Sequence, residues 1–337
     1  MDRKTIRIVL LGNGRVGKRL FELAASLKTD VAKAAEIRGL GVIGRTRVLV
    51  DCGLGIGADL LRGEAREVAQ LFRREAPVLV DASSGDTFDL HLEWLTRGWT
   101  VVTANKRPLS DTQERYDELM RAAAGDRCRY WFETTVGAGL PVIRTARELV
   151  ATGDVRIGFT AALSGTLGFI TEHCAGGGKL KHAIVAAQRF GYTESDPRED
   201  LSGRDVLRKA MILARLFGWR GEEHSVNFTP FIEPELLEEA TWLNRIDAGA
   251  AKMIKRLRGN RRISDRYVAT CSESGVRVGF LPLERDSRIA GIEGTENMVC
   301  FFSDRYASGL TIAGPGAGLD VTAAGLLGDV YRSVGLL

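Results

Sequence analysis

A glycine-rich turn between a buried strand and an amphipathic helix constrains the fold of this chain most. The apolar run 6–11 reads as a fully buried strand, residues 12–17 are Gly-Asn-Gly-Arg-Val-Gly, and apolar residues recur at helical spacing over 20–27. Here the first glycine permits a tight turn, the second lets a pyrophosphate approach the backbone, and the third lets helix pack on strand, while the helix N-terminus adds partial positive charge. The motif predicts a dinucleotide site with the cofactor-binding residues Gly12, Gly14, Arg15, Val16 and Gly17.

Strand and helix signals alternate through the region 1–140. Strands are predicted at 40–43, 78–81 and 99–103, and helices at 89–95 and 112–123. This alternation is the βα pattern of a parallel sheet with helices on both faces. The predicted fold class is α/β: a Rossmann-type doubly wound parallel sheet over 1–140, to which 314–337 returns, and a second α+β domain for substrate binding and dimerisation, with its substrate and catalytic part at 156–289.

The end of the second strand bears on the choice of dinucleotide. NAD calls for an acidic residue there to bind the ribose 2′-hydroxyl, whereas this chain has Arg45 and Arg47. Guanidinium groups suit a 2′-phosphate, so NADP is favoured and Arg45 is predicted to bind it. NAD is the alternative, because Asp51 lies close by in the sequence and would take the carboxylate role if the strand ended later.

Two further loops follow predicted strands of the same sheet. Ser83 and Ser84 come after one strand, and Asn105 and Lys106 come after the next. Ligands of such folds bind at the carboxyl edge of the sheet, so these four residues are predicted to contact the cofactor. For Lys106 alone, a solvated loop lysine is an equal alternative, and its position at a strand end favours function.

A carboxylate-rich stretch, 191–209, ends in the pair Asp205 and Lys209 near the start of a predicted helix. We expect Ser202 to be the N-cap, Asp205 to complete a capping box, and the helix to end at Phe217. Helical spacing places the pair on a face that becomes buried one turn later. The opposite, solvent-facing stripe should consist of Arg204, Arg208 and Arg215.

A lysine held beside a carboxylate in a partly desolvated cleft can accept and donate a proton. Lys209 and Asp205 are therefore candidate catalytic residues. An ordinary i,i+4 ion pair is the alternative for an isolated Asp-x-x-x-Lys.

Three glycine-rich turns follow predicted strands in the rest of the chain. Glu133 precedes the turn 136–140, whose exposed carbonyls could hold a monovalent cation, although a hinge between domains would also need small residues. Gly165 and Thr166 open a predicted helix and suit a substrate carboxylate, with Ser164 as an alternative simple N-cap. The turn 314–318, which includes Gly316, could approach the nicotinamide or phosphates, or be a plain turn.

Composition and charge indicate which classes of ligand and partner the protein can bind. The net charge is +4 and no run of like charges suggests a nucleic-acid or membrane arm, so we expect a small-molecule substrate, no nucleic acid and no membrane. The five cysteines have no Cys-x-x-Cys spacing, which argues against disulfides and zinc. No signal peptide or long apolar run is evident, so a cytoplasmic protein is expected. The four histidines, predicted to be surface or packing residues, are His91, His173, His182 and His224.

These signatures together resemble the homoserine dehydrogenase family, in order and over essentially the whole chain. Besides the first glycine motif they are Asn105-Lys106, Glu133-x-x-Val-Gly-Ala-Gly-Leu-Pro141, Ser164-Gly-Thr-Leu167, Gly191-Tyr-Thr-Glu-x-Asp-Pro197, Asp200-Leu-x-Gly-x-Asp205-Val-x-x-Lys209, and Gly314-Pro-Gly-Ala-Gly318 with Val321-Thr-Ala-Ala-Gly325. The chain departs from the family pattern at Glu199 and at Gly168-Phe169.

The resemblance implies a role for each matched residue. Lys209 and Lys106 would handle protons, Asp205 and Glu194 would orient substrate and water, and Gly165 and Thr166 would hold homoserine. The substrate ammonium would suit Glu194 or Asp200. Sodium would be bound by Glu133 and the backbone of Val136, Ala138 and Leu140.

The function implied is NADP-linked interconversion of L-homoserine and L-aspartate 4-semialdehyde, in the route to threonine and methionine. A homodimer is implied through 141–155 and 290–313, where strand signals occur. An aspartokinase or regulatory ACT domain is not expected. The alternatives are a related dehydrogenase of another small hydroxy or amino acid, which the Gly168-Phe169 departure leaves open, and a dinucleotide-binding protein without turnover.

Overall fold

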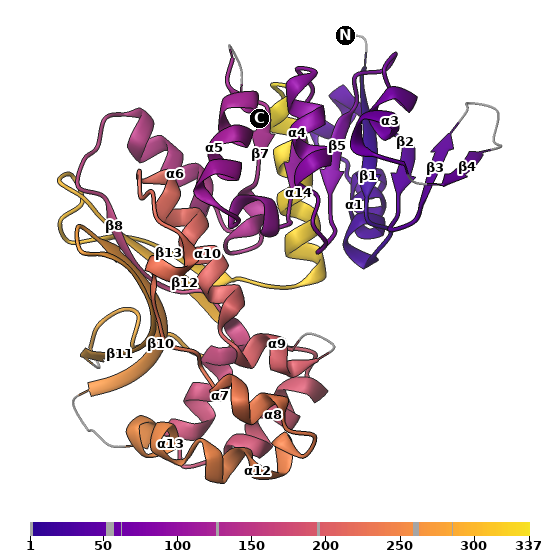
Figure 1. The fold of residues 1–337 in the computed structure, drawn as a ribbon. Coiled ribbons are helices and arrows are strands. Elements are labelled where there is room, and N and C mark those ends of the chain that lie inside the picture. Colours follow the sequence, from indigo (N-terminus) through magenta and orange to yellow (C-terminus); the bar gives the residue numbers. More distant parts are fainter. Residues whose placement is uncertain are drawn as a thin grey trace. The chain divides into compact units, whose positions relative to one another are not determined.

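The structure is a computed structural model that describes residues 3–51, 57–61, 63–125, 128–193, 196–258, 263–284 and 286–337. The chain divides into two compact units, Met1–Gly139 with Ala317–Leu337, and Leu140–Gly316. Figure 1 shows the C-terminal helix among the N-terminal elements of the first unit.

The first unit is built on a seven-stranded sheet with the order β4-β3-β2-β1-β5-β6-β7. Its parallel strands are β1 (Lys4–Leu11), β2 (Ala35–Ile43), β5 (Val78–Asp81), β6 (Val101–Thr103) and β7 (Tyr130–Trp131). The predicted doubly wound parallel sheet is confirmed. The edge hairpin of β3 (Arg47–Asp51) and β4 (Gly57–Leu61) is antiparallel and was not predicted, because its strands are too short to give a clear alternation signal.

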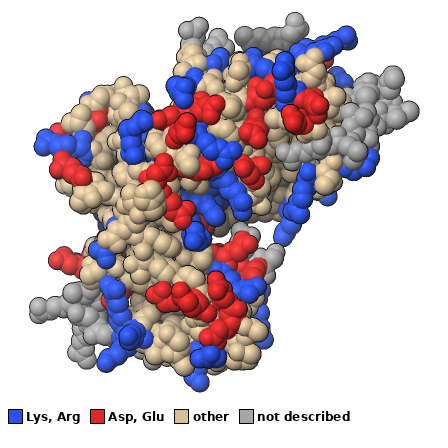
Figure 2. Space-filling view, viewed as in Figure 1, with Lys and Arg blue, Asp and Glu red and all other residues tan. Residues whose placement is uncertain are grey.

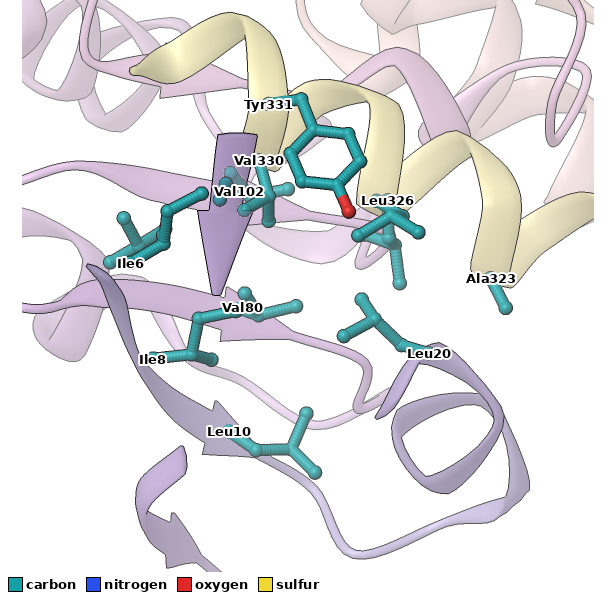
Figure 3. Close-up of a cluster of buried hydrophobic side chains, with 13 residues drawn as sticks. Ile6, Ile8, Leu10, Leu20, Val80, Val102, Ala323, Leu326, Val330 and Tyr331 are labelled. Carbon is teal, nitrogen blue, oxygen red and sulfur yellow. The ribbon is translucent and has the colours of Figure 1, made fainter. Parts of the chain in front are cut away.

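Helices cover this sheet, and the last helix of the chain completes its core. They are α1 (Arg15–Ser26), α2 (Asp30–Ala34), α3 (Ala65–Leu71), α4 (Phe88–Thr96), α5 (Gln113–Ala123) and α14 (Leu319–Ser333), with 3-10 turns η1 (Arg107–Leu109) and η2 (Glu133–Thr135). On α14, Ala323, Leu326 and Val330 recur at helical spacing and are fully buried. Figure 3 shows them with Ile8, Val80 and other strand residues. Each large side chain buried in this way contributes roughly 1.5–3 kcal/mol.

The second unit contains a six-stranded mixed sheet with the order β13-β12-β8-β10-β11-β9. The strands are β8 (Gly158–Ala162), β9 (Asn227–Phe228), β10 (Ile263–Ser272), β11 (Gly275–Glu284), β12 (Glu296–Phe302) and β13 (Leu310–Pro315). The segment 290–313 thus supplies strands to the sheet that contains β8. The strand signal read in 141–155 was wrong, because that segment forms the amphipathic helix α6 (Val142–Ala151).

The helices of the second unit other than α6 are α7 (Gly165–Ala175), α8 (Leu180–Arg189), α9 (Pro197–Leu201), α10 (Arg204–Leu216), α11 (Pro234–Glu238), α12 (Trp242–Gly249) and α13 (Ala251–Arg258), with the 3-10 turn η3 (Glu223–Ser225). Helix α10 packs on β10 and β11 and against α6. None of the helices in the described part of the chain is both long and apolar enough to cross a membrane.

Three predictions for α10 were wrong. Ser202 is the C-cap of α9, and Gly203, in the left-handed conformation at φ 74°, is the N-cap of α10. Because a glycine N-cap has no side chain, Asp205 completes no capping box. Only a residue without a Cβ turns the chain so sharply between two helices at no steric cost. Arg215 is only 5% exposed, because α10 is enclosed on all sides over 210–215. Its guanidinium bonds the carbonyl of Gly221 instead of facing solvent.

Candidate active site

The three glycines of the first turn have three different surroundings. Gly12 has φ +93°, and a Cβ there would lie 3.1 Å from Ser83 Cβ. A Cβ on Gly14 would have nothing within 4 Å, so the backbone there is open to a ligand. A Cβ on Gly17 would lie 2.6 Å from Leu10 Cδ2. The turn therefore needs glycine for backbone conformation, for ligand approach and for helix–strand packing, in that order.

Helix α1 begins at Arg15 without a side-chain cap at Gly14 and without an acidic residue in its first turn. Its first N–H groups and its dipole therefore favour an anion. The end of β2 lies beside this turn, because the Gly12 N–H donates to the Ile43 carbonyl over 2.9 Å. Arg45 follows two residues later and is exposed.

The backbone of β3 runs away from the glycine turn. β3 pairs with β2 in antiparallel register, with Gly41 opposite Val50. Asp51 thus lies near the middle of β2 along the strand direction, whereas Arg45 lies past its end at Ile43. The Asp51 side chain lies outside the described part of the structure.

The loops that follow β5 and β6 are joined through a buried carboxylate. Asp81 is fully buried, and it accepts hydrogen bonds from the Ser83 N–H (2.8 Å), the Thr87 hydroxyl (2.8 Å), the Asn105 amide (3.1 Å) and His91 Nε2 (3.0 Å). Burial alone would raise the pKa of Asp81, but the bonds from His91 and Ser83 outweigh it, and the pKa lies below its ordinary value. Asp81 is therefore ionised at neutral pH.

The side chain of Asn105 bonds several segments of the first unit, and the cofactor contact predicted for this residue stays a prediction. Asn105 is 3% exposed, and its amide nitrogen also donates to the Gly85 carbonyl over 2.9 Å. Its amide oxygen accepts from the Arg107 N–H over 3.1 Å. The buried side chain thus ties the loop 83–85 to the loop that carries Lys106. Lys106 itself is partly buried.

The prediction for His91 was incomplete. His91 is a packing residue in that it is fully buried, but both ring nitrogens have partners: Nε2 lies 3.0 Å from Asp81 Oδ2 and Nδ1 lies 2.8 Å from the Tyr130 hydroxyl. The sequence did contain a signal, because a carboxylate that ends a wholly apolar strand needs buried donors. That reasoning would have pointed to Asp81 and to the polar residues of the following helix.

Glu133 and the turn after it lie at the end of the first unit. Glu133 is 6% exposed, and its N–H donates to Asp329 Oδ2 over 2.9 Å. Ala138 has a positive φ of 52°, and Val136 is fully buried. Leu140 begins the second unit, where its carbonyl accepts the Val142 N–H over 2.8 Å. Within the described ranges no group of three or more His, Cys, Asp or Glu is placed to hold a metal.

In the second unit, the ammonium of Lys209 is held on two sides. Nζ lies 2.8 Å from Asp205 Oδ2 and donates to the Leu163 carbonyl over 2.7 Å. The Lys209 side chain is 12% exposed and that of Asp205 is 37% exposed, so the pair is partly desolvated. Leu163 follows β8 and directly precedes Ser164, which places the ammonium at the start of α7. A partly desolvated lysine ammonium held beside a carboxylate can donate and accept a proton.

Comparisons with known proteins found one matching family and several relatives. The family model described as homoserine dehydrogenase matches residues 141–331. A homoserine dehydrogenase of Emericella nidulans is 36% identical over 279 residues, which cover 76% of this chain and 75% of that protein.

The chain belongs to the homoserine dehydrogenase family.

Other relatives of this homoserine dehydrogenase family member differ in length. A bifunctional aspartokinase/homoserine dehydrogenase of Zea mays is 32% identical and covers 98% of this chain, while the chain spans only 39% of that protein. A hyperthermophilic archaeal homoserine dehydrogenase mutant, solved in complex with NADPH, has a TM-score of 0.76 and 25% identity, with 98% of each chain covered. A Candida auris protein of unknown function has a TM-score of 0.87 at 25% identity, over 98% of each chain.

The loop at the start of α7 has its hydroxyls engaged within the protein. Ser164 is the N-cap, since its hydroxyl accepts the Leu167 N–H over 3.2 Å. The Thr166 hydroxyl is buried and donates to the Tyr192 carbonyl. A Cβ on Gly165 would lie 2.4 Å from the Thr295 carbonyl oxygen. The contact implied for Gly165 and Thr166 would therefore come from backbone groups and not from hydroxyls.

The residues at the family departure form an aromatic group next to this loop. The Phe169 ring lies 5.3 Å from that of Tyr192 and 6.1 Å from that of Phe190. Asp200 lies in α9 and is partly buried. Glu194 lies outside the described residues.

Gly316 packs against a buried amide that sequence reasoning did not single out. A Cβ on Gly316 would lie 2.0 Å from Asn297 Cγ. Asn297 is 1% exposed, and neither amide atom has a hydrogen-bond partner among the described residues. The turn 314–318 needs glycine here for close packing within the second unit.

Proposed function

We propose that the protein interconverts L-homoserine and L-aspartate 4-semialdehyde with a nicotinamide dinucleotide. The observation that supports this most is the ammonium of Lys209, fixed between Asp205 and the Leu163 carbonyl at the start of α7 in a chain of this family. A proton carrier held in this way is what oxidation of a primary alcohol requires.

The chain fits a dinucleotide at its first turn. Backbone at Gly14 is open, α1 has an uncapped N-terminus, and Ser83 Oγ is a buried hydroxyl without a hydrogen-bond partner among the described residues. Gly12, Gly14, Arg15, Val16 and Gly17 would hold the pyrophosphate, and Ser83 and Ser84 would line the site. When bound, the dinucleotide supplies the hydride acceptor or donor of the reaction.

NADP is the favoured dinucleotide. Arg45 is exposed just beyond the end of β2, where a 2′-phosphate would be met, and the β3 backbone carries Asp51 away from that point. NAD is the second candidate. The relative that was solved with NADPH is consistent with the first choice.

Different residues of the chain would handle the protons and bind the substrate. In the oxidation direction Lys209 takes the proton of the homoserine hydroxyl, and in reduction it returns a proton to the aldehyde oxygen. Asp205 and the Leu163 carbonyl hold the ammonium of Lys209 in place, and Lys106 is the second proton-handling lysine. The substrate carboxylate would meet the N–H groups of Gly165 and Thr166, and its ammonium would meet Asp200 and Glu194.

The proposal includes a monovalent cation, most simply sodium, bound by the Glu133 carboxylate and the carbonyls of Val136, Ala138 and Leu140. It also includes a homodimer through 141–155 and 290–313. Exposed apolar side chains in and next to these segments support this interface: Val150 is 44%, Val155 54% and Phe302 39% exposed. Figure 2 shows Lys and Arg interleaved with Asp and Glu on the face in view, which fits a small-molecule enzyme better than a nucleic-acid binder.

A panel of small aldehydes, each with NADPH and with NADH, tests the proposal. L-aspartate 4-semialdehyde with NADPH should give the largest kcat/KM. A larger value with another hydroxy- or amino-acid aldehyde would favour the related-dehydrogenase alternative. Tight NADPH binding with no turnover on any aldehyde would favour the non-catalytic alternative.

A further inference from the structure

Asp81 has no part in the proposed reaction, yet four donors from three segments converge on it. The Ser83 N–H bonds one carboxylate oxygen; the Thr87 hydroxyl, His91 Nε2 and the Asn105 amide bond the other. A fully buried carboxylate without such donors would be strongly destabilising. These residues therefore form one hydrogen-bonded network, the Asp81 network, whose members depend on one another.

The hydroxyl of Thr87 belongs to the Asp81 network and does not cap its own helix. Thr87 is the N-cap residue of α4, but its side chain makes no cap hydrogen bond. Instead it donates to Asp81 over 2.8 Å and lies 3.0 Å from the Asn105 amide nitrogen, from which it accepts. A capping residue that forgoes its usual bond indicates that the bonds to Asp81 and Asn105 matter more here.

His91 connects the Asp81 network to the edge strand of the sheet. Because Nε2 faces a carboxylate it carries a hydrogen, and Nδ1 shares a hydrogen bond with the Tyr130 hydroxyl over 2.8 Å. The series Tyr130–His91–Asp81 thus links β7, α4 and β5 in one hydrogen-bonded chain.

Asn105 transmits this fixed arrangement to Lys106. On one side of Lys106, the Asn105 N–H donates to the Thr103 hydroxyl over 2.9 Å and its amide oxygen accepts the Arg107 N–H. On the other side, the Lys106 carbonyl accepts from the N–H and hydroxyl groups of Ser110, at 3.0 and 2.9 Å. The backbone at Lys106 is therefore held before and after the residue.

We propose that Asp81, with Thr87 and His91, is a positioning centre that fixes the lysine of the following loop, Lys106, for proton handling. This inference rests on the proposed function. Asp81 does not touch substrate or dinucleotide; it acts through Asn105. A displacement of about 1 Å at a reacting group can lower the rate as much as 100-fold, so a buried anchor has a large effect on turnover.

A double-mutant cycle between Thr87 and Lys106 tests the proposal. Thr87→Val keeps the shape and removes the hydroxyl, whereas Thr87→Ser keeps the hydroxyl. With Lys106 present, Thr87→Val should lower kcat for aldehyde reduction roughly 10- to 100-fold with KM nearly unchanged, and Thr87→Ser should restore most of it. In the Lys106→Met background Thr87→Val should change kcat less than about twofold, because the anchor has nothing left to position.

Hydrogen exchange supplies a readout that does not depend on turnover. Amides of 105–110 should exchange faster in Thr87→Val than in Thr87→Ser or the wild type. Trp94→Phe is a matched control on the same helix, since it removes one buried hydrogen bond, Nε1 to the Pro77 carbonyl at 3.2 Å, away from Asn105. It should lower Tm and leave kcat unchanged. If Thr87→Val does not fold, His91→Phe removes another donor and should show the same dependence on Lys106.

The outcomes separate the two proposals. Equal effects of Thr87→Val on kcat with and without Lys106, or unchanged exchange at 105–110, would overturn the positioning centre. A wild-type protein without turnover would overturn the proposed function, while faster exchange in Thr87→Val would still support the anchoring of the loop.

Discussion

The two units form their proposed ligand sites by different means. In the first unit the glycine turn of β1 and α1 offers backbone: open space at Gly14 and uncapped N–H groups. In the second unit Lys209 offers one charged side chain, held by a carboxylate and a carbonyl. A backbone site depends on local conformation, whereas a side-chain site depends on contacts between distant segments. Substitutions in the glycine turn should change dinucleotide binding, and substitutions at Lys209 should change turnover.

The largest effect is expected at Lys209. Lys209→Met should lower kcat roughly 10²- to 10⁴-fold, the usual worth of a general acid–base group. NADPH affinity should stay unchanged, measured by fluorescence titration. Asp205→Asn should lower kcat less than Lys209→Met does, since the Leu163 carbonyl still holds the ammonium of Lys209. Equal kcat in Lys209→Met and wild type would show that the Lys209 side chain is not the proton carrier.

Arg45 tests the choice of dinucleotide. Arg45→Ala should lower kcat/KM with NADPH by roughly 10- to 100-fold, because a charge-assisted contact to the 2′-phosphate is lost. The value with NADH, which lacks that phosphate, should barely change. Steady-state kinetics with both dinucleotides measure this; a parallel loss with both would show that Arg45 does not select between them.

Gly14 and Gly17 form a matched pair within one turn. Gly17→Ala should destabilise the protein by about 1–3 kcal/mol, since the new Cβ would lie 2.6 Å from Leu10 Cδ2. Gly14→Ala has room for its methyl group, so stability should change by less than about 0.5 kcal/mol while NADPH binding weakens. Urea unfolding and NADPH titration of both variants measure the difference. The reverse pattern would contradict the assigned roles.

The smallest expected effect is an acid-dependent loss of stability through Asp81. Its pKa is lowered in the folded protein by the bonds from His91 and Ser83, which exceed the effect of burial. The folded state thus binds the proton less readily than the unfolded state, so this contribution is fully present above about pH 4 and is lost as pH falls through the folded pKa. Urea unfolding of wild type and Asp81→Asn across that range should show a steeper acid loss in the wild type.

The sequence predicted the backbone-based features more completely than the side-chain networks. The strand 78–81 and the turn 12–17 are local patterns, and the structure contains them. The helix predicted to end at Phe217 ends at Leu216, with Phe217 as its C-cap. The partners of Lys209 and His91 could not be read in this way. Leu163 lies 46 residues before Lys209, and Tyr130 lies 39 residues after His91. Only the tertiary fold brings such groups together.

Errors arose where one local pattern fitted two structures. Ser202 has the chemistry of an N-cap, but Gly203 in the left-handed region ends one helix and begins the next. Arg215 follows a polar stripe by spacing, but the helix there is enclosed by its unit. The Arg215 error comes from treating a buried helix as a surface helix.

The proposed reaction transfers a hydride between the nicotinamide ring and the substrate, and isotope transfer measures this step. The protein is given NADPH that carries deuterium at the transferable C4 position, together with L-aspartate 4-semialdehyde, and the product is analysed by mass spectrometry. We expect L-homoserine with deuterium on the new alcohol carbon. Unlabelled homoserine, or no homoserine despite bound NADPH, would contradict the proposed reaction.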